Sequence, residues 1–445
     1  MAMDLAIRNA SLVRPTGIEL LSIGVAEGRI VEIAPELSQK ANETIDAAAF
    51  HAFPGVVDAH VHFNDPGRAD WEGAATGSAA FAAGGGSCFI DMPLNSSPPT
   101  LERASFEAKL AALAASHTDF ALWGGLTPDN LDRLEELAEC GVVGFKAFMS
   151  GSGIDDFRAC DDLTLYRGMK TAATLGLPVA VHAESEAITS ALAAIARTAG
   201  RTSIRDYLDS RPILAEAEAI SRALLYAEET GCAIHVVHVS SARGVSLVRR
   251  AADSGLADAT CETCPHYLLF SEEDVMRLGA SAKCAPPLRP TRERDRLVAA
   301  VGAGRVDTIG SDHSPAPAAM KQTKDFFTVW GGISGVQTTL RTLLTLELPP
   351  PLIARLISER PAQRFRLPGK GAIEVGADAD LSLVDLTVSA PLRREELLDR
   401  HRLSPYVGRT LRGAVRRTLV RGATVYLDGK IVGKPAGRFV RPKMR

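Results

Sequence analysis

Short apolar runs alternate with longer stretches rich in Ala and Leu through the middle of the chain, from Phe53 to about Leu367. The runs are rich in Val, Ile and Phe, and we count eight of them, at 54–62, 87–92, 120–125, 142–148, 178–183, 233–239, 257–263 and 306–312. The stretches between them predict helices, such as the one from Leu214 to Thr230 that is followed by Gly231. This alternation is typical of β/α units, and eight strands are the number that closes a (β/α)8 TIM-like barrel.

The two ends of the chain follow a different pattern. Residues 1–52 and 371–435 read as short alternating strands separated by glycine turns, as in AIEVGADADLSLVDL and RTLVRGATVYLDGKIVG, and this pattern indicates β meanders. We therefore predict an α/β protein in three segments. The N-terminal part of a small β domain lies at 1–52, the barrel at 53–367, and the C-terminal part of the small domain with a tail at 368–445. The two ends together are expected to form one β-sandwich beside the barrel.

The composition of the chain excludes several classes of protein. With 46% hydrophobic and 23% charged residues, the chain differs from disordered, collagenous and coiled-coil proteins. Its 50 Lys and Arg residues nearly balance 53 Asp and Glu residues, and the net charge of -3 gives no general attraction to nucleic acid or anionic lipid. We therefore expect a small-molecule substrate, no nucleic-acid partner and no membrane association. The basic segment at 401–445 is interpreted as a solvated face or a subunit contact, with a polyanion site as the alternative.

The cysteines and the N-terminal segment indicate the compartment. Seven cysteines, an odd number in a long chain, do not match the disulfide framework of a small secreted domain and favour reduced thiols. Asp4 and Arg8 interrupt the apolar stretch that a signal peptide needs, and no later segment offers about 18 consecutive apolar residues. We expect a cytoplasmic protein.

Candidate metal ligands occur where five of the predicted strands end. In a barrel the carboxyl ends of the strands meet at one mouth, where such proteins place their chemistry. Because residues i and i+2 of a strand point to the same side, His60 and His62 can bind one ion. Taken alone, this pair is explained more simply by two hydrogen-bonded histidines. The joint placement of six groups favours a metal site, and these groups are His60, His62, Lys146, His182, His238 and Asp312.

The other histidines receive different interpretations. His235 lies three residues before His238, so strand geometry turns it to the opposite face, and we expect a packed core histidine. His313 is placed to orient a ligand or contact substrate, or else to pack behind the site. Three further histidines are interpreted as structural: His51, His117 and His266.

The pair Cys261 and Cys264 has the CxxC spacing of zinc and redox motifs. A structural zinc ion would need a second pair of ligands with similar spacing, and Cys88 and Cys284 do not supply one. We interpret Cys261 and Cys264 as small residues at the end of the seventh strand and in its loop.

Lys146 needs a separate explanation, because a charged ammonium group would be repelled by a nearby dication. The side chain must therefore be neutral or modified. A neutral amine can add carbon dioxide to give a carbamate, whose two oxygens can bridge two metal ions as a carboxylate does.

Six motifs spread over nearly the whole chain together resemble one family. The motifs FPGVVDAHVHFNDPG, GFKAFMS, VAVHAES, IHVVHVSS, CPHYL and GSDHSP are similar to those of the amidohydrolase superfamily and, within it, of the cyclic amidohydrolases. The resemblance implies two divalent metal ions, with zinc favoured and cobalt, iron or manganese also suited to these ligands. It implies a bridging hydroxide as the nucleophile and a homo-oligomer, with a tetramer favoured. The implied ligands are His60, His62, carbamylated Lys146 (N6-carboxylysine) and Asp312 for one ion, and Lys146, His182 and His238 for the other.

Two positions separate the members of this family. Dihydroorotases typically carry an Arg two residues after the His-x-His pair, where this chain has Asn64, and dihydropyrimidinases and hydantoinases usually carry a Tyr about five residues after the lysine, where this chain has Gly151. The segments HFNDPGRADWEG, DMPLNSSPPT, SDHSP and WGGISGVQTTL are similar instead to those of the allantoinases, which open the ring of allantoin to give allantoate. Dihydropyrimidinase, hydantoinase or dihydroorotase activity is the alternative, and a non-catalytic scaffold of the same fold is a remote third.

The same resemblance implies roles for residues at the mouth. Backbone groups near Ala285 and Gly331 would bind the hydantoin ring. Asn95 and Ser314 are candidates for positioning the ureido arm, although both lie in proline-containing loops where turn formation alone explains them. Asp312 would take a proton from the attacking hydroxide and return it to the ring nitrogen. Asn64 is a further predicted substrate contact, and residues 314–329 are long and polar enough to cap the mouth as a mobile lid.

Overall fold

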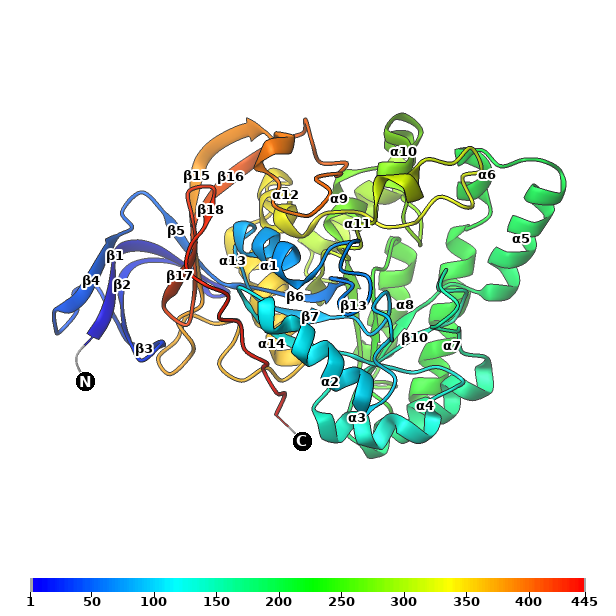
Figure 1. The fold of residues 1–445 in the computed structure, drawn as a ribbon, viewed down its shortest axis with the longest axis horizontal. Coiled ribbons are helices and arrows are strands. Elements are labelled where there is room, and N and C mark those ends of the chain that lie inside the picture. Colours follow the sequence, from blue (N-terminus) through cyan, green and yellow to red (C-terminus); the bar gives the residue numbers. More distant parts are fainter. Residues whose placement is uncertain (1–2, 444–445) are drawn as a thin grey trace.

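The computed structural model describes residues 3–443 and contains a barrel with a smaller β domain at one side (Figure 1). Only Trp123 separates β8 from β9, so we count these two segments as one strand of the barrel. On this count the described residues form eight barrel strands, as the sequence predicts. The strands of the barrel are β6 (Val56–Val61), β7 (Gly86–Asp91), β8 (Asp119–Leu122), β9 (Gly124–Gly125), β10 (Phe145–Phe148), β11 (Val179–His182), β12 (Ile234–Val236), β13 (Ala259–Thr263) and β14 (Thr308–Ile309).

The strands pair in parallel around the barrel. One sheet has the order β6-β7-β8 and the other the order β14-β13-β12-β11-β10-β9. The circle closes where Val61 forms a parallel bridge with His313, and the His62 N–H donates to the His313 carbonyl at 2.8 Å. Most of these strand residues are buried on both faces, which explains why they read as continuous apolar runs in the sequence.

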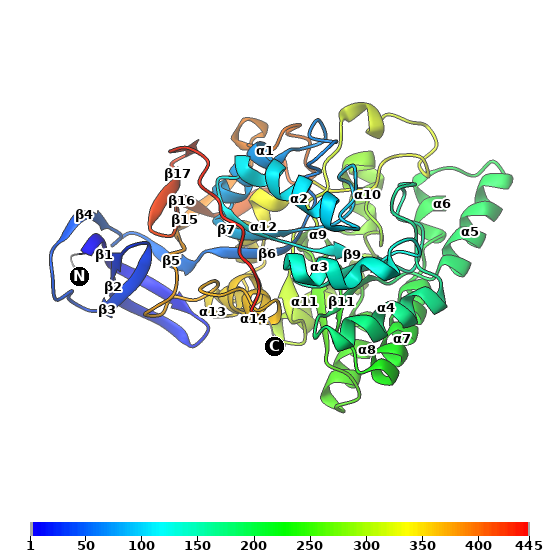
Figure 2. The ribbon, with the colours of Figure 1, turned by 60° about the horizontal axis from the view of Figure 1, so that its bottom comes forward.

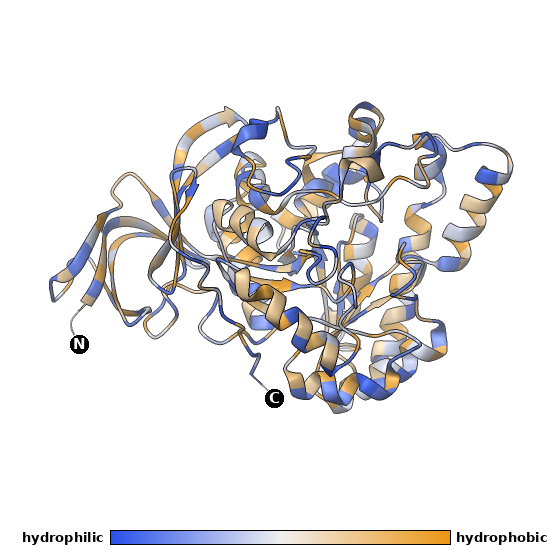
Figure 3. Cartoon of the chain, viewed as in Figure 1, coloured by the Kyte–Doolittle hydropathy of each residue, from blue (hydrophilic) through white to orange (hydrophobic). Residues whose placement is uncertain are grey.

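The helices lie around the barrel and carry bands of hydrophobic and hydrophilic residues (Figure 3). The predicted helix near Leu214 is confirmed as α7, which ends where Gly231 takes a left-handed φ of 67°. The helices are α1 (Ala74–Ala83), α2 (Arg103–Ala112), α3 (Leu134–Cys140), α4 (Asp162–Thr174), α5 (Glu186–Thr198), α6 (Ile204–Asp209), α7 (Ile213–Thr230), α8 (Ala242–Asp253), α9 (Pro265–Leu269), α10 (Glu272–Leu278), α11 (Thr291–Gly302), α12 (Thr339–Thr345), α13 (Pro350–Ala354) and α14 (Arg360–Arg364).

Side chains pack the inside of the barrel. Val57, Ala121 and Ala180 belong to one buried cluster that also contains Trp123. The Trp123 ring contacts the ring of Phe365 just after α14, with ring centroids 5.0 Å apart. The barrel therefore has a solid core, and its chemistry is confined to the strand ends.

Both ends of the chain build the small β domain (Figures 1 and 2). Its strand order is β18-β17-β16-β15-β5-β1-β2-β3, and β4 pairs with β1. Because β15 pairs antiparallel with β5, the C-terminal strands continue the sheet of the N-terminal strands, and the predicted fold class is confirmed. The boundaries at 52/53 and 367/368 stay a prediction. The strands are β1 (Met3–Arg14), β2 (Gly17–Ala26), β3 (Arg29–Ala34), β4 (Ala41–Asp46), β5 (His51–Pro54), β15 (Leu381–Pro391), β16 (Thr410–Val420), β17 (Ala423–Leu427) and β18 (Lys430–Ile431).

The basic C-terminal segment differs in part from the sequence interpretation of a solvated face or subunit contact. Phe120 of β8 donates its N–H to the Arg438 carbonyl at 3.0 Å and accepts from the Val440 N–H at 2.7 Å. The guanidinium group of Arg421 pairs with the buried carboxylate of Asp119. Part of this segment is therefore held on the barrel by backbone pairing, which a count of basic residues does not reveal.

Among residues 3–443, no helix combines the length and the apolar character needed to cross a membrane.

Candidate metal centre

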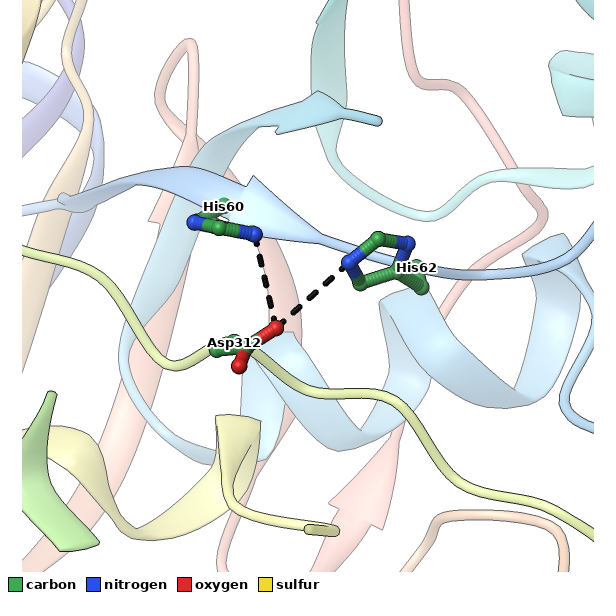
Figure 4. Close-up of side chains that lie close together, drawn as sticks. All are labelled: His60, His62 and Asp312. Atoms are coloured by element: carbon green, nitrogen blue, oxygen red, sulfur yellow. Dashed lines mark ion pairs between the residues drawn. The ribbon is translucent and has the colours of Figure 1, made fainter. Parts of the chain in front are cut away.

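Three side chains from the first and last strands of the barrel converge at its mouth (Figure 4). His60 and His62 come from the end of β6, and Asp312 follows β14. The Nε2 atoms of both histidines lie 3.4 Å from Oδ1 of Asp312. Two imidazole nitrogens and a carboxylate oxygen within 4.8 Å of one another form a set that can hold a divalent ion.

A second group of three lies at the ends of the neighbouring strands. Nδ1 of His182 lies 3.1 Å from Nε2 of His238. The amine of Lys146 is fully buried without a hydrogen-bond partner, and it lies 4.7 Å from the ring centroid of Phe148, which stacks on His182. The two imidazole nitrogens are within hydrogen-bond distance of each other, but the buried Lys146 amine has no partner, and such a group is costly unless another group satisfies it. This second group therefore also fits a cation, with a modified lysine as the anionic member.

Buried carboxylates behind the ligands determine which ring nitrogen faces the mouth. Oε1 of Glu262 lies 2.8 Å from Nδ1 of His60, which leaves Nε2 of His60 for the mouth. Oε2 of Glu184 lies 2.9 Å from Nε2 of His182, which leaves Nδ1, and Glu184 is in turn paired with Arg211. Such outer carboxylates fix the tautomer and orientation of metal-binding histidines.

Burial and charge shift the pKa values of the candidate ligands. Burial lowers the pKa of Lys146 to about 7, so a large fraction of the amine is neutral near pH 7. Burial also lowers the pKa values of His62 and His182, and that of His238 falls well below its ordinary value. Burial alone would raise the pKa of Asp312, but the neighbouring His60 and His62 outweigh it and lower that pKa. Neutral imidazoles and an ionised carboxylate are the forms that bind metal ions.

Three residues at the barrel mouth have strained backbone conformations. His238 and Asp312 adopt left-handed φ angles of 40° and 45°, and Asn95 has a φ of 67°. Such conformations cost energy in residues other than glycine, and they persist where surrounding structure fixes them, often at functional sites. The sequence gives no signal for these angles.

The histidines assigned other roles are placed as follows. His235 is buried, with Nδ1 2.8 Å from the Thr260 hydroxyl and Nε2 3.8 Å from Glu262, and His313 accepts the Gly335 N–H at 3.2 Å. His266, interpreted from sequence as structural, is fully buried with both ring nitrogens unpartnered.

The seven cysteines are free thiols, and all are buried. Cys261 and Cys264 do not pair, but the Cys264 thiol lies within 4.8 Å of ligand atoms of His266 and Asp312. The sequence interpretation of Cys264 as a small loop residue missed this proximity. The spacing CPHYL was a signal that a thiol and an imidazole are close, but their approach to Asp312 depends on the closed barrel.

An open cavity of about 540 Å³ lies at this mouth. Four predicted substrate contacts line it: Asn95, Ala285, Ser314 and Gly331. Asn64 is buried, and its amide nitrogen lies 3.5 Å from the Pro315 carbonyl. The cavity is also lined by Phe148, Cys284 and Trp330, which sequence reasoning did not select.

The segment proposed as a lid, 314–329, is anchored by two lysines, of which Lys283 is buried and Lys321 half-buried. The Lys321 ammonium donates to the carbonyls of Ala280, Trp330 and Gly332. The Lys283 ammonium donates to three more carbonyls, those of Phe326, Phe327 and Val329. The segment is therefore anchored at several points.

Comparison with known proteins identifies relatives along the whole chain. The model of the Amidohydrolase family matches residues 52–432. An allantoinase from Rubrobacter xylanophilus is 55% identical, with 99% of this chain and 98% of that protein covered. Allantoinases from Solibacter usitatus and Deinococcus radiodurans are 54% and 52% identical, with at least 97% of each chain covered.

Solved structures of hydantoinases share the fold. The L-hydantoinase (dihydropyrimidinase) from Arthrobacter aurescens superposes with a TM-score of 0.96 at 34% identity, and the match covers 99% of this chain and 100% of that one. A D-hydantoinase structure gives a TM-score of 0.90 at 28% identity, with 99% of each chain covered. The family model and the full-length relatives show that this chain belongs to the amidohydrolase family.

Proposed function

We propose that this chain is an allantoinase, which hydrolyses a ring amide of allantoin to give allantoate. The observation that carries the choice of substrate is the end-to-end identity of 52–55% with allantoinases from three bacteria. The convergence of histidines and a carboxylate on one open cavity supports hydrolysis of a cyclic amide at this site.

The side chains at the strand ends would hold two divalent ions. Zinc is favoured, and cobalt, iron or manganese also suit histidine and carboxylate ligands. When bound, the ions would polarise the scissile carbonyl and lower the pKa of water toward about 7. The proposed first set is His60, His62, Asp312 and carbamylated Lys146, and the proposed second set is Lys146, His182 and His238.

Lys146 is suited to carbamylation by its surroundings. Its amine has no hydrogen-bond partner, and burial brings its pKa to about 7. A neutral amine attacks carbon dioxide through its lone pair, and loss of one proton leaves a carbamate that carries one negative charge and two oxygens. The modified side chain would thus replace a buried, unpartnered amine by an anionic ligand.

Asp312 would move the proton during ring opening. As the water oxygen bonds to the carbonyl carbon, Asp312 accepts the proton that the water loses. As the carbon–nitrogen bond breaks, the same carboxyl group donates that proton to the departing ring nitrogen. Asp312 is suited to this part because its low pKa leaves it ionised before attack.

The lining of the cavity suits a neutral ring. Among the described residues, those that line it include neither arginine nor lysine, and burying a carboxylate needs a cationic or strongly donating partner. Backbone groups at Ala285 and Gly331 would bind the diamide ring, and Asn95 and Ser314 would position the ureido arm. Asn64, at the position where dihydroorotases carry an arginine, was predicted as a substrate contact, but it is buried and is not among the residues that line the cavity.

Further proposals concern the whole protein. We expect a homo-oligomer, with a tetramer favoured, in the cytoplasm. The small β domain is proposed to comprise residues 1–52 and 368–445, with the catalytic barrel at 53–367.

A substrate panel tests the proposed function. Purified enzyme loaded with zinc, cobalt or manganese is given allantoin, dihydroorotate, dihydrouracil and hydantoin, and the initial rates are compared. We expect kcat/KM for allantoin at least about 100-fold above that for dihydroorotate, the scale found when a buried polar group lacks its partner. Comparable rates on both, or a preference for dihydrouracil, would refute the assignment.

Hydantoinase activity is the second candidate, because solved structures of hydantoinases match over nearly the whole chain. The lower sequence identity of these structures, 34% and 28%, makes allantoin the better choice. Faster opening of hydantoin or dihydrouracil than of allantoin in the same panel would reverse this order. A chain that binds metal but opens none of the four rings would instead be a non-catalytic scaffold.

A further inference from the structure

Trp330 presents an unpaired hydrogen-bond donor beside the candidate active site. Its side chain lines the cavity that His60, His62 and Asp312 also line. The indole Nε1 is buried, and among residues 3–443 it has no hydrogen-bond partner. An indole nitrogen can only donate a hydrogen bond, and leaving such a group buried and unpaired is costly.

A second tryptophan shows the ordinary arrangement. Nε1 of Trp123, inside the barrel core, donates to the Ala59 carbonyl at 3.0 Å. Trp123 does not border the cavity, so its donor is satisfied within the fold. The unpaired donor of Trp330 is thus associated with its position at the cavity.

The ring of Trp330 is held in place from several sides. It packs edge-on against Trp71, with ring centroids 4.7 Å apart and an interplanar angle of 70°. Arg68 lies over the Trp71 ring and pairs with Asp156 at 2.9 Å. The backbone of Trp330 is fixed as well, because its carbonyl accepts from Lys321 at 3.0 Å. The ring of Trp330 is therefore held in one position before any ligand enters.

The position of Trp330 indicates which part of a substrate it meets. The ring carbonyl under attack must lie beside the converging ligands at the strand ends, where His60 and His62 are buried and the Asp312 side chain is 12% exposed. Trp330 belongs to a loop and, like Trp71, is only partly buried, so this pair lies nearer to solvent. A substituent on the ring that extends away from the scissile carbonyl would point toward this rim.

We propose that Trp330 is a specificity residue whose Nε1–H donates a hydrogen bond to the carbonyl oxygen of the ureido arm of the substrate. This proposal rests on the proposed function and deepens it, because it explains how a ring with an acceptor-bearing arm is preferred over the bare ring. The ligand class is a neutral five-membered cyclic diamide with a ureido or similar carbonyl-bearing substituent.

The Trp330→Phe variant tests the proposal, because it keeps an aromatic ring against Trp71 and removes the donor together with part of the indole, and the hydantoin rate measures any effect of the lost ring atoms. We expect kcat/KM for allantoin to fall about 10- to 100-fold, the range for a polar group left without its partner. For hydantoin, which has the ring without the arm, kcat/KM should stay within about twofold of wild type. The Trp123→Phe variant is the matched control, and its allantoin-to-hydantoin ratio should be unchanged even if its melting temperature falls.

A binding measurement separates recognition from turnover. In the background of Asp312→Asn, which is expected to turn substrate over slowly, calorimetry of metal-loaded protein should show weaker allantoin binding when Trp330→Phe is added, with hydantoin binding unchanged. An equal loss on both ligands, or no loss on either, would overturn the role of Trp330. Failure of the wild-type enzyme to open allantoin would refute the proposed function itself, and it is recorded before any variant is compared.

Discussion

At the scale of single residues, Lys146 carries the most specific chemical expectation. The Lys146→Ala change removes the proposed bridging anion, so we expect fewer than two metal ions per chain and a fall in kcat of at least about 100-fold, the upper range for losing even an outer contact of a metal site. Metal content by plasma mass spectrometry and the allantoin rate measure both effects. Added short carboxylic acids should restore part of the activity by replacing the missing carboxylate.

The control is Lys170→Ala on α4, because the Lys170 side chain is exposed and is not a proposed metal ligand. Its metal content and rate should match wild type. A Lys146→Ala enzyme with two ions per chain and normal turnover would show that the carbamate assignment is wrong.

Asp312 separates metal binding from proton transfer. The Asp312→Asn change keeps the size of the side chain and leaves the histidine ligands intact, so we expect a folded protein with at least one bound ion. Because the amide cannot carry the proton, kcat should fall at least about 100-fold, the usual contribution of general acid–base catalysis. Steady-state kinetics on allantoin and metal analysis test this. A kcat within about twofold of wild type would mean that another group moves the proton.

At the scale of elements, the loop after β14 is held in place by the ammonium group of Lys321. Lys321 donates to three backbone carbonyls, and burial lowers its pKa to about 8. These bonds connect the loop to Trp330 and Gly332 at the cavity. The ammonium therefore positions part of the cavity wall from behind.

The Lys321→Met change tests this anchoring, because it keeps the length of the side chain and leaves the three carbonyls without their donor. We expect a loss of about 1–3 kcal/mol in local stability, seen as faster hydrogen exchange across 314–332, together with a higher KM for allantoin. Lys324→Met on the same loop is the control, since Lys324 is exposed. Unchanged exchange in Lys321→Met would show that the loop is held by other contacts.

Some of these elements could be predicted from the sequence, and others could not. The eight strands were predictable because a fully buried parallel strand leaves a continuous apolar run, and the shared direction of His60 and His62 follows from strand alternation. The placement of Trp330, and the approach of Cys264 and His266 to Asp312, were not predictable in this way. They depend on loops and on barrel closure, which join residues far apart in sequence and follow no local period.

The pairing of the small β domain was only partly predictable for a related reason. Gly turns and alternation indicated strands at both ends, but the pairing of β15 with β5 joins segments more than 300 residues apart. The attachment of residues 438–440 to β8 likewise needs the finished barrel as a template.

At the scale of the whole molecule, the proposed metal site lies where the barrel closes. His60 and His62 belong to the first strand, and Asp312 follows the last. Direct pairing of the two strands here consists of the bridge between Val61 and His313 with the neighbouring His62 hydrogen bond. An ion bound by all three side chains would therefore join the first strand to the last, and its binding energy would add to the stability of the closed barrel.

Removal of metal should therefore loosen the barrel at this closure. An ion present at 100 times its dissociation constant stabilises the fold by about 2.7 kcal/mol. Because the unfolding entropy of 445 residues is about 0.9 kcal/mol/K, at about 2.1 cal/mol/K per residue, chelation should lower the melting temperature by roughly 3 °C. Hydrogen exchange should quicken most at 58–62 and 308–314. Zinc added back should reverse both changes, whereas magnesium, which prefers oxygen ligands, should not. If exchange quickened equally in the small β domain, or if the melting temperature did not change, the ion would not contribute to closure.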